Sequence, residues 1–189
     1  GIVAVLENGP GPTVMIRADM DGLPVKEDSG LPYASTATQV DADGRERPVM
    51  HACGHDVHVT ALVGTARQMV ARKDDWSGTL MLVVQPAEER IIGARAMRDD
   101  GIWERFGTPD YALAFHVGAG APAGKIDAPE GPTYAGADTV DIIVHGVGAH
   151  GASPHAGKDP VLIGSQIVVA LQTLVSRELA PHAPGVVTV

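Results

Sequence analysis

Short apolar runs alternate with segments of helical period over the first 115 residues, and this alternation limits the possible folds more than any other feature of the chain. Residues 80–84 form the most apolar run, which suits a strand covered on both faces. Residues 57–73 and 93–100 have helical spacing, and residues 111–115 form a second run expected to be buried. The order predicts an α/β fold with a mostly parallel sheet and flanking helices.

The segments outside this alternation are also expected to have defined structure. Two β-prone runs, residues 2–6 and 13–18, flank a cluster of turn residues at 8–12 and predict a hairpin-like connection. Residues 20–50 have no clear period and predict a long loop, which in a compact domain is often functional.

The pattern begins again near residue 131. It predicts a strand over 139–145, a long helix over 160–178 and another strand from 186. We therefore expect two domains, residues 1–130 and residues 131–189, the second being the start of a smaller β-α-β satellite domain. Its last strand would lack a partner and the chain does not begin with Met, so we expect a piece of a longer protein.

Charge and cysteine content exclude several classes of partner. The net charge of -9 would repel nucleic acid and anionic membrane surfaces alike. The single cysteine, Cys53, forbids an intramolecular disulfide and makes a cytoplasmic location the default. No apolar run approaches the roughly 20 residues that span a bilayer. The sequence therefore predicts no nucleic-acid partner and no membrane association.

Residues 51–58 contain three imidazoles, a thiol and a carboxylate just before the first predicted helix. The side chains are those of His51, Cys53, His55, Asp56 and His58. Such side chains ligate zinc and related ions, although the spacing is not that of a zinc-finger pair. Two other interpretations stay open, a polar surface loop around a buried cysteine and a cysteine nucleophile with a histidine partner.

Further ligand-type side chains follow predicted strands. Glu88 and Glu89 come after the most apolar strand, His116 ends the next one, and an Asp-Met-Asp segment at 19–21 ends an earlier one. Ligands in open parallel sheets collect at the carboxyl ends of strands. The two glutamates could instead begin a helix, where acidic residues are favourable, and a lone histidine is usually a hydrogen-bonded edge residue. The recurrence at several strand ends favours one shared site.

Residues 146–151 match the dinucleotide pattern G-x-G-x-x-G. That pattern should open a helix at once, but Ser153-Pro154-His155 follows and the predicted helix begins only near Asp159. Nucleotide binding is therefore not expected.

Four motifs follow one another along the chain: RADMDGLP at 17–24, MHACGHD at 50–56, QPAEE at 85–89 and FHV at 115–117. In this order they resemble those of a known family, the metal-dependent N-acyl-amino-acid amidohydrolases of the aminoacylase/carboxypeptidase type, which include hippurate hydrolases and auxin-conjugate hydrolases. The resemblance continues through GAH at 148–150 and LQTLVSR at 171–177. It covers essentially the whole chain.

The resemblance implies a catalytic α/β domain that binds two divalent ions (zinc, manganese, cobalt or nickel) and a satellite domain that forms a homodimer. At the matching positions the metal ligands would be Cys53, His55, Glu89 and His116. Glu88 would be the general base and acid, Asp21 would support the site, and His150 would reach a dimer partner's site to polarise the scissile carbonyl. The implied reaction is hydrolysis of the amide bond of an N-acyl amino acid.

The chain departs from the family pattern in two places. Arg90, Ile91 and Ile92 stand where the family usually has glycines, and a last metal-ligand histidine is expected from a closing segment beyond residue 189. We therefore expect the 189-residue chain alone to bind metal incompletely and to be inactive. The alternative to an amidohydrolase is a catalytically silent fragment or association module.

Overall fold

The computed structural model describes residues 1–120, 122–131 and 133–189. The chain divides into two compact units, Gly1–Ile126 and Asp127–Val189.

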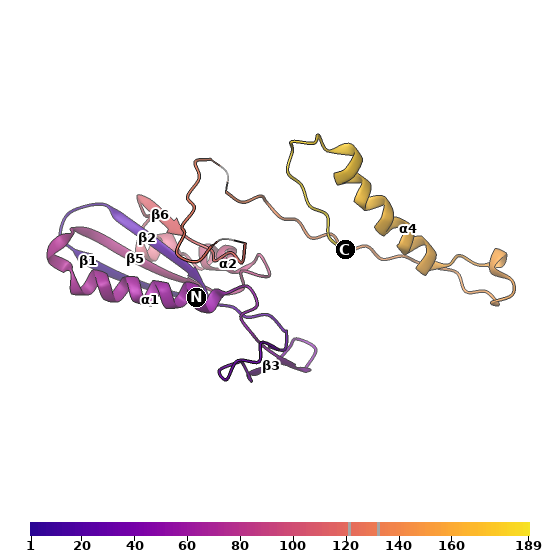
Figure 1. The fold of residues 1–189 in the computed structure, drawn as a ribbon, viewed down its shortest axis with the longest axis horizontal. Helices are drawn as coiled ribbons and strands as arrows, with labels where there is room; N and C mark the ends of the chain where they lie inside the picture. The colour runs from indigo at the N-terminus through magenta and orange to yellow at the C-terminus, as the bar shows by residue number, and fades with distance from the viewer. Residues whose placement is uncertain (121, 132) are drawn as a thin grey trace. The chain divides into compact units, whose positions relative to one another are not determined.

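The first unit is built on a four-stranded sheet of order β1-β5-β2-β6 (Figure 1). The strands are β1 (Ile2–Asn8), β2 (Thr13–Asp19), β5 (Gly78–Gln85) and β6 (Tyr111–Ala114). Strand β2 runs parallel to both β5 and β6, and β1 is antiparallel to β5. The prediction of a mostly parallel sheet with flanking helices is confirmed.

The predicted hairpin of the first two strands is wrong. Strands β1 and β2 are connected by a tight turn, yet β5 lies between them and pairs with both. The reason is burial: Leu80, Met81 and Val83 of β5 are 3%, 0% and 5% exposed, so the most apolar strand takes the centre of the sheet. The N–H of Thr79, near the start of β5, donates a hydrogen bond to the Pro12 carbonyl at the end of the turn.

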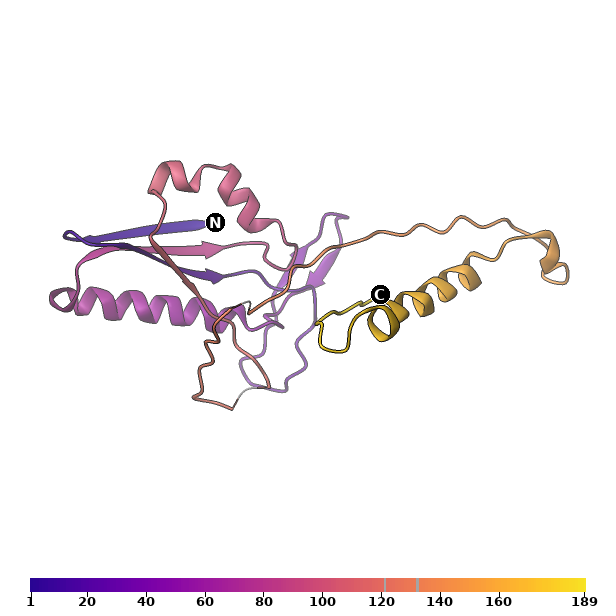
Figure 2. The ribbon, with the colours of Figure 1, turned by 90° about the horizontal axis from the view of Figure 1, so that it is seen from above.

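Helices cover both faces of the sheet, as Figure 2 shows. Helix α1 (His55–Ala71) lies along one face, and α2 (Gly93–Asp99) with α3 (Ile102–Phe106) lies on the other. Helix α3 was not predicted. The core on the α2–α3 face consists of Met81, Val83 and Ile102, with partly buried Val3, Met15, Met97, Trp103 and Phe106 around it.

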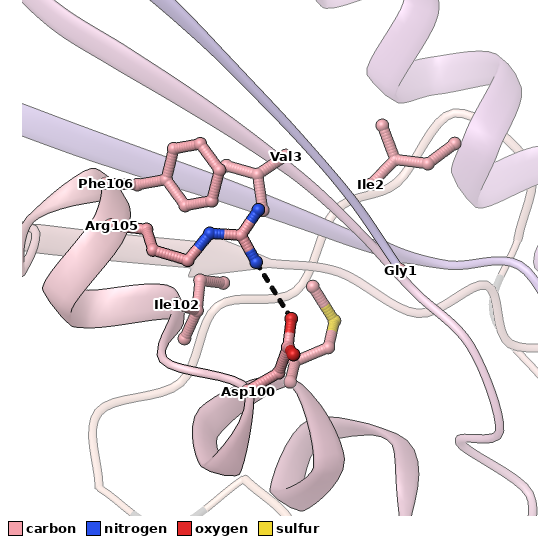
Figure 3. Close-up of a pocket in the computed structure, with 8 residues that line it drawn as sticks. Gly1, Ile2, Val3, Asp100, Ile102, Arg105 and Phe106 are labelled. Atoms are coloured by element: carbon pink, nitrogen blue, oxygen red, sulfur yellow. Dashed lines mark hydrogen bonds and ion pairs between the residues drawn. The ribbon is translucent and has the colours of Figure 1, made fainter.

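A pocket of about 310 Å³ lies where β1 meets α2 and α3 (Figure 3). Its two charged side chains are paired with each other, since the Arg105 guanidinium lies 2.9 Å from the Asp100 carboxylate; the guanidinium also lies 5.2 Å from the centre of the Phe106 ring. An ion pair therefore lies in this pocket at the edge of the core.

Two expectations about the rest of this unit are wrong. Strand β6 is an exposed edge strand rather than a buried run, with Tyr111 62% and Leu113 58% exposed, because among the described residues it pairs with β2 alone. The predicted long loop at 20–50 contains a small antiparallel pair, β3 (Thr38–Val40) with β4 (Glu46–Pro48). A short 3₁₀-helix, η1 (Lys73–Asp75), follows α1.

The second unit consists of extended segments and one long helix. It contains η2 (Pro154–Ala156), α4 (Pro160–Thr173) and a π-helical continuation, η3 (Leu174–Glu178). Asp159 caps α4, because its carboxylate accepts hydrogen bonds from the N–H groups of Val161 and Leu162.

The strands predicted at 139–145 and from 186 do not form. Neither segment has a partner strand among the described residues, and a strand needs a ladder of hydrogen bonds. In this unit the described pairing is a single bridge between Val147 and Lys158.

Contrary to the expectation from hydropathy, one helix, Pro160–Glu178, is long and apolar enough to cross a membrane, with a mean hydropathy of 1.3 and none of it buried. One such helix is weak evidence for a membrane span, because core helices of soluble proteins have the same length and hydropathy.

Candidate metal centre

The carboxyl ends of the three parallel strands bring the predicted site residues to one edge of the sheet. Asp21 follows β2, Glu88 and Glu89 follow β5, and His116 follows β6. His55 is the first residue of α1, which packs against β2 and β5. The topology therefore gathers side chains that lie up to about a hundred residues apart in the sequence.

The loop before α1 depends on a glycine. Gly54 has a left-handed backbone, with φ of 80°, and a Cβ there would lie 2.4 Å from a Val117 methyl group. This close approach places Cys53 beside the end of β6, where its Sγ lies 3.3 Å from Nε2 of His116. One ligand atom each from Cys53, His55 and His116 lie within 4.8 Å of one another.

Asp21 orients two of the candidate ligands. Nδ1 of His55 lies 3.0 Å from the Asp21 carbonyl oxygen and 3.2 Å from its Oδ1, so this nitrogen carries the proton and donates. The other carboxylate oxygen of Asp21 accepts a 3.0 Å hydrogen bond from the Glu89 N–H. Asp21 thereby joins α1 to the loop after β5.

The lone pairs that remain fit a cation. Nε2 of His55 and Oε1 of Glu89 are both buried without a hydrogen-bond partner among the described residues. They lie 3.9 Å apart, and Nε2 of His55 is also 3.7 Å from Oε2 of Glu88. Nδ1 of His116 donates to the Val117 carbonyl, so the lone pair on its Nε2 faces Cys53, whose Sγ lies 3.3 Å away. Buried acceptors without donors are costly unless a cation satisfies them, so the residues fit divalent ions.

A strained loop presents the two glutamates. Ala87 and Ile91 have positive φ values of 49° and 57°, which are rare for residues with a Cβ and a genuine outlier for a β-branched one. The N–H of Ile91 donates to the Glu88 carbonyl at 2.8 Å, and the N–H of Gly93 donates to Ala87 at 3.1 Å. These bonds close residues 86–93 into a compact turn.

Several carboxylates bring negative charge to the site. Burial raises the pKa of the Cys53 thiol, and the neighbouring carboxylates of Glu89, Glu88 and Asp19 raise it further. Burial alone would also raise the pKa of Asp19, but the hydrogen bond from His58 and the charge of Arg17 outweigh it, so the pKa of that carboxyl is lowered. The cluster thus holds negative charge that a bound cation would neutralise.

Asp19 and His58 are among the ligand-type side chains that the sequence indicates, without a specific role for either, and both are 0% exposed and lie in this cluster. One signal was available, because His58 lies three residues after His55 and therefore on the same face of α1. Both ring nitrogens of His58 are already engaged, so it offers no free lone pair.

The remaining residues of interest lie elsewhere. His150 belongs to the second unit, where its exposed ring accepts a hydrogen bond from the Ala152 N–H. In the first unit, a pocket of about 660 Å³ next to the site is lined by Asp21, His51 and residues from the segment that contains β3 and β4, but by none of the four candidate ligands.

Comparison with known proteins places the chain in a family. The family model for peptidase family M20/M25/M40 matches residues 15–186. An N-acetyl-L-cysteine deacetylase of Bacillus subtilis is 38% identical over 95% of this chain and 40% of its own length. A hippurate hydrolase of Campylobacter jejuni is 38% identical over the whole chain and 46% of its own length.

A solved structure shares the fold of the chain. A dinuclear metal-binding peptidase of Bacillus subtilis has a TM-score of 0.60 and 35% identity, covering 69% of this chain and 33% of its own. The chain spans less than half the length of the curated relatives described above. Since the family match extends over most of its residues, the chain belongs to peptidase family M20/M25/M40.

Proposed function

We propose that the protein containing this chain hydrolyses the amide bond of N-acyl amino acids with two divalent metal ions held in part by this site. The observation that carries the proposal is the convergence of two buried acceptors without donors, on His55 and Glu89, beside the Cys53–His116 pair. The relatives are named for deacetylation of N-acetyl-L-cysteine and hydrolysis of hippurate, which are both N-acyl amino acids.

The proposed ligands are Cys53, His55, Glu89 and His116. Of the three groups of potential ligand atoms that share His55, one includes Cys53 and His116 and another includes Glu88 and Glu89. Thiolate, imidazole and carboxylate together suit zinc, manganese, cobalt or nickel. A divalent ion bound there would polarise the scissile carbonyl and lower the pKa of water, which makes hydroxide available near neutral pH.

Glu88 is the proposed general base and acid. Its side chain is 38% exposed, whereas that of Glu89 is 24% exposed and its backbone N–H is bonded to Asp21. The more accessible carboxylate can take a proton from the attacking water and return it to the leaving amine. Asp21 acts by orienting the ring of His55 and the backbone of Glu89.

The remaining parts of the proposal concern the whole protein. We propose a homodimer formed through the second unit, in which His150 polarises the substrate carbonyl in the partner's site, and a cytoplasmic location in keeping with the single cysteine. The ligand set is proposed to be completed by a histidine from a segment outside residues 1–189, and the isolated chain is proposed to be inactive.

The test separates the two adjacent glutamates. In the protein containing this chain, Glu88→Gln should keep the bound metal per chain but lower turnover of an N-acyl amino acid by about 10²- to 10⁴-fold, because proton transfer is lost while the ligands stay. Glu89→Ala should lower bound metal first. Glu104→Gln, on the exposed surface of α3, is the matched control and should change neither.

The outcomes are distinct. Loss of metal in Glu88→Gln with metal retained in Glu89→Ala would show that the two roles are exchanged. A metal-loaded protein that releases no amino acid from any N-acyl substrate would support the catalytically silent alternative instead.

A further inference from the structure

The position of His116 is not explained by its strand. The ladder between β2 and β6 ends at the pair Arg17–Ala114, so His116 lies two residues beyond the last paired residue of an exposed edge strand. The hydrogen bond from Nδ1 of His116 goes to the carbonyl of its own neighbour, Val117, which orients the ring but does not attach it to the rest of the protein. A metal ligand in such a segment needs another support.

His58 makes that support from the buried side of the site. Its Nδ1 is hydrogen-bonded to Oδ1 of Asp19, and its Nε2 accepts a 3.0 Å hydrogen bond from the Val117 N–H. The centre of its ring lies 5.2 Å from the centre of the Phe115 ring and 4.6 Å from the centre of the His116 ring, and both pairs of rings are nearly edge-on. His58 therefore contacts each of the three residues 115–117.

These contacts determine the state of the His58 ring. Nδ1 carries the proton, because the acceptor beside it is a carboxylate, and Nε2 has the lone pair, because it faces an N–H donor. Asp19 is held in turn by Arg17, whose guanidinium lies 2.7 Å from Oδ2. The result is a chain of contacts from the end of β2, through α1, to the backbone beside His116.

We infer that His58 is a positioning residue of the metal centre, which holds the backbone after β6 so that His116 faces Cys53. Although Asp19, His55 and His58 could be seen as a third ligand group, His58 has no lone pair left for an ion. The inference rests on the proposed metal-binding function, and it predicts which ion is affected: the one bound by Cys53 and His116.

A pair of substitutions separates the bond to Val117 from the bond to Asp19. The amide of Gln reaches as far as Nε2 of histidine, so His58→Gln places a carbonyl oxygen where it can accept from the Val117 N–H. The amide of Asn reaches only as far as Nδ1, so His58→Asn keeps a donor for Asp19 and loses the bond to Val117. Both variants fill the buried site with a polar group, which makes each the control for the other.

The measurement is a cobalt(II) titration of the protein containing this chain. The thiolate-to-cobalt charge-transfer band reports only the ion bound at Cys53. We expect His58→Asn to weaken that binding by about 10- to 100-fold. We expect His58→Gln to stay within a few-fold of the wild type. Equal affinity of His58→Asn and wild type, or equal loss in both variants, would overturn the inference.

A second measurement needs neither substitution nor metal. Val117 is 37% exposed, so its amide would exchange quickly with solvent unless the bond to His58 protects it. We expect slow hydrogen exchange at Val117 in the metal-free protein, and exchange at the rate of an unprotected loop amide would refute the inference. A wild-type protein with no charge-transfer band at all would refute the metal ligation by Cys53 that the proposed function includes, while slow exchange at Val117 would still support the positioning contact.

Discussion

Replacing Gly93 by alanine should open the loop that carries Glu88 and Glu89. A Cβ on Gly93 would lie 1.5 Å from the Pro86 carbonyl oxygen, whereas Cβ contacts under 3.0 Å essentially never occur. The clash is with backbone, so no side-chain rotation relieves it. The two ends of the 86–93 segment must move apart until that distance about doubles.

The cost follows from the bonds that would break. The N–H of Gly93 donates to the Ala87 carbonyl at 3.1 Å, and that of Ile92 donates to the same oxygen at 3.4 Å. At about 1 kcal/mol for a good hydrogen bond and less for a long one, the free energy of unfolding should fall by about 1–2 kcal/mol. Because the loop positions Glu88 and Glu89, the metal affinity should fall by about 10- to 100-fold.

Urea denaturation of the metal-free protein and chelator-competition titration measure the two effects. Gly64→Ala is the matched control, since Gly64 lies within α1 and its Cβ would meet nothing within 4 Å. That variant should be more stable by about 0.5–1 kcal/mol and bind metal normally. If Gly93→Ala matched Gly64→Ala in both assays, the reasoning about the loop would be wrong.

Three further predictions test separate parts of the first unit. Cys53 should be alkylated more slowly in the metal-bound protein than in the metal-free protein. The two rates are compared at alkaline pH, where a thiol of raised pKa ionises. Equal rates would count against metal ligation by Cys53. Ile91→Gly should raise the free energy of unfolding by up to about 1 kcal/mol, because it removes the strain of a β-branched residue in the left-handed backbone conformation. A lower free energy of unfolding, measured by chemical denaturation, would contradict this strain. Hydrogen bonds from the Arg45 N–H and the Arg47 guanidinium lower the pKa of Asp41 below 3.8. Hydrogen-exchange protection of the β3–β4 pair should therefore persist above pH 3.8 and decline only as the pH falls through the lowered pKa. Complete loss of protection at a pH above 3.8 would argue against this role of Asp41.

Several features of this protein follow from its sequence alone. The continuous apolar run at 80–84 and the helical spacing after residue 57 predict β5 and α1, because strand and helix periods are local properties of the chain. The types of side chain that carry the site are also local, since a thiol and imidazoles before a helix, together with carboxylates and an imidazole at strand ends, indicate a metal site wherever the sheet is parallel.

Tertiary structure alone decided which strands pair. The turn after β1 favours a hairpin locally, but inserting β5 between β1 and β2 buries Met81 completely, and that burial outweighs the local preference. The strands predicted at 139–145 and from 186 had suitable composition, yet a strand forms only when another strand is beside it.

The roles of the histidines were likewise decided by contacts between distant segments. His55 and His58 lie on the same helix three residues apart and have the same side chain, so sequence could not distinguish them. Asp21 binds one nitrogen of His55 and leaves the other free, whereas Asp19 and the Val117 N–H occupy both nitrogens of His58. An imidazole can ligate a metal only through a free lone pair, and which lone pair is free depends on the neighbours that the fold brings to it.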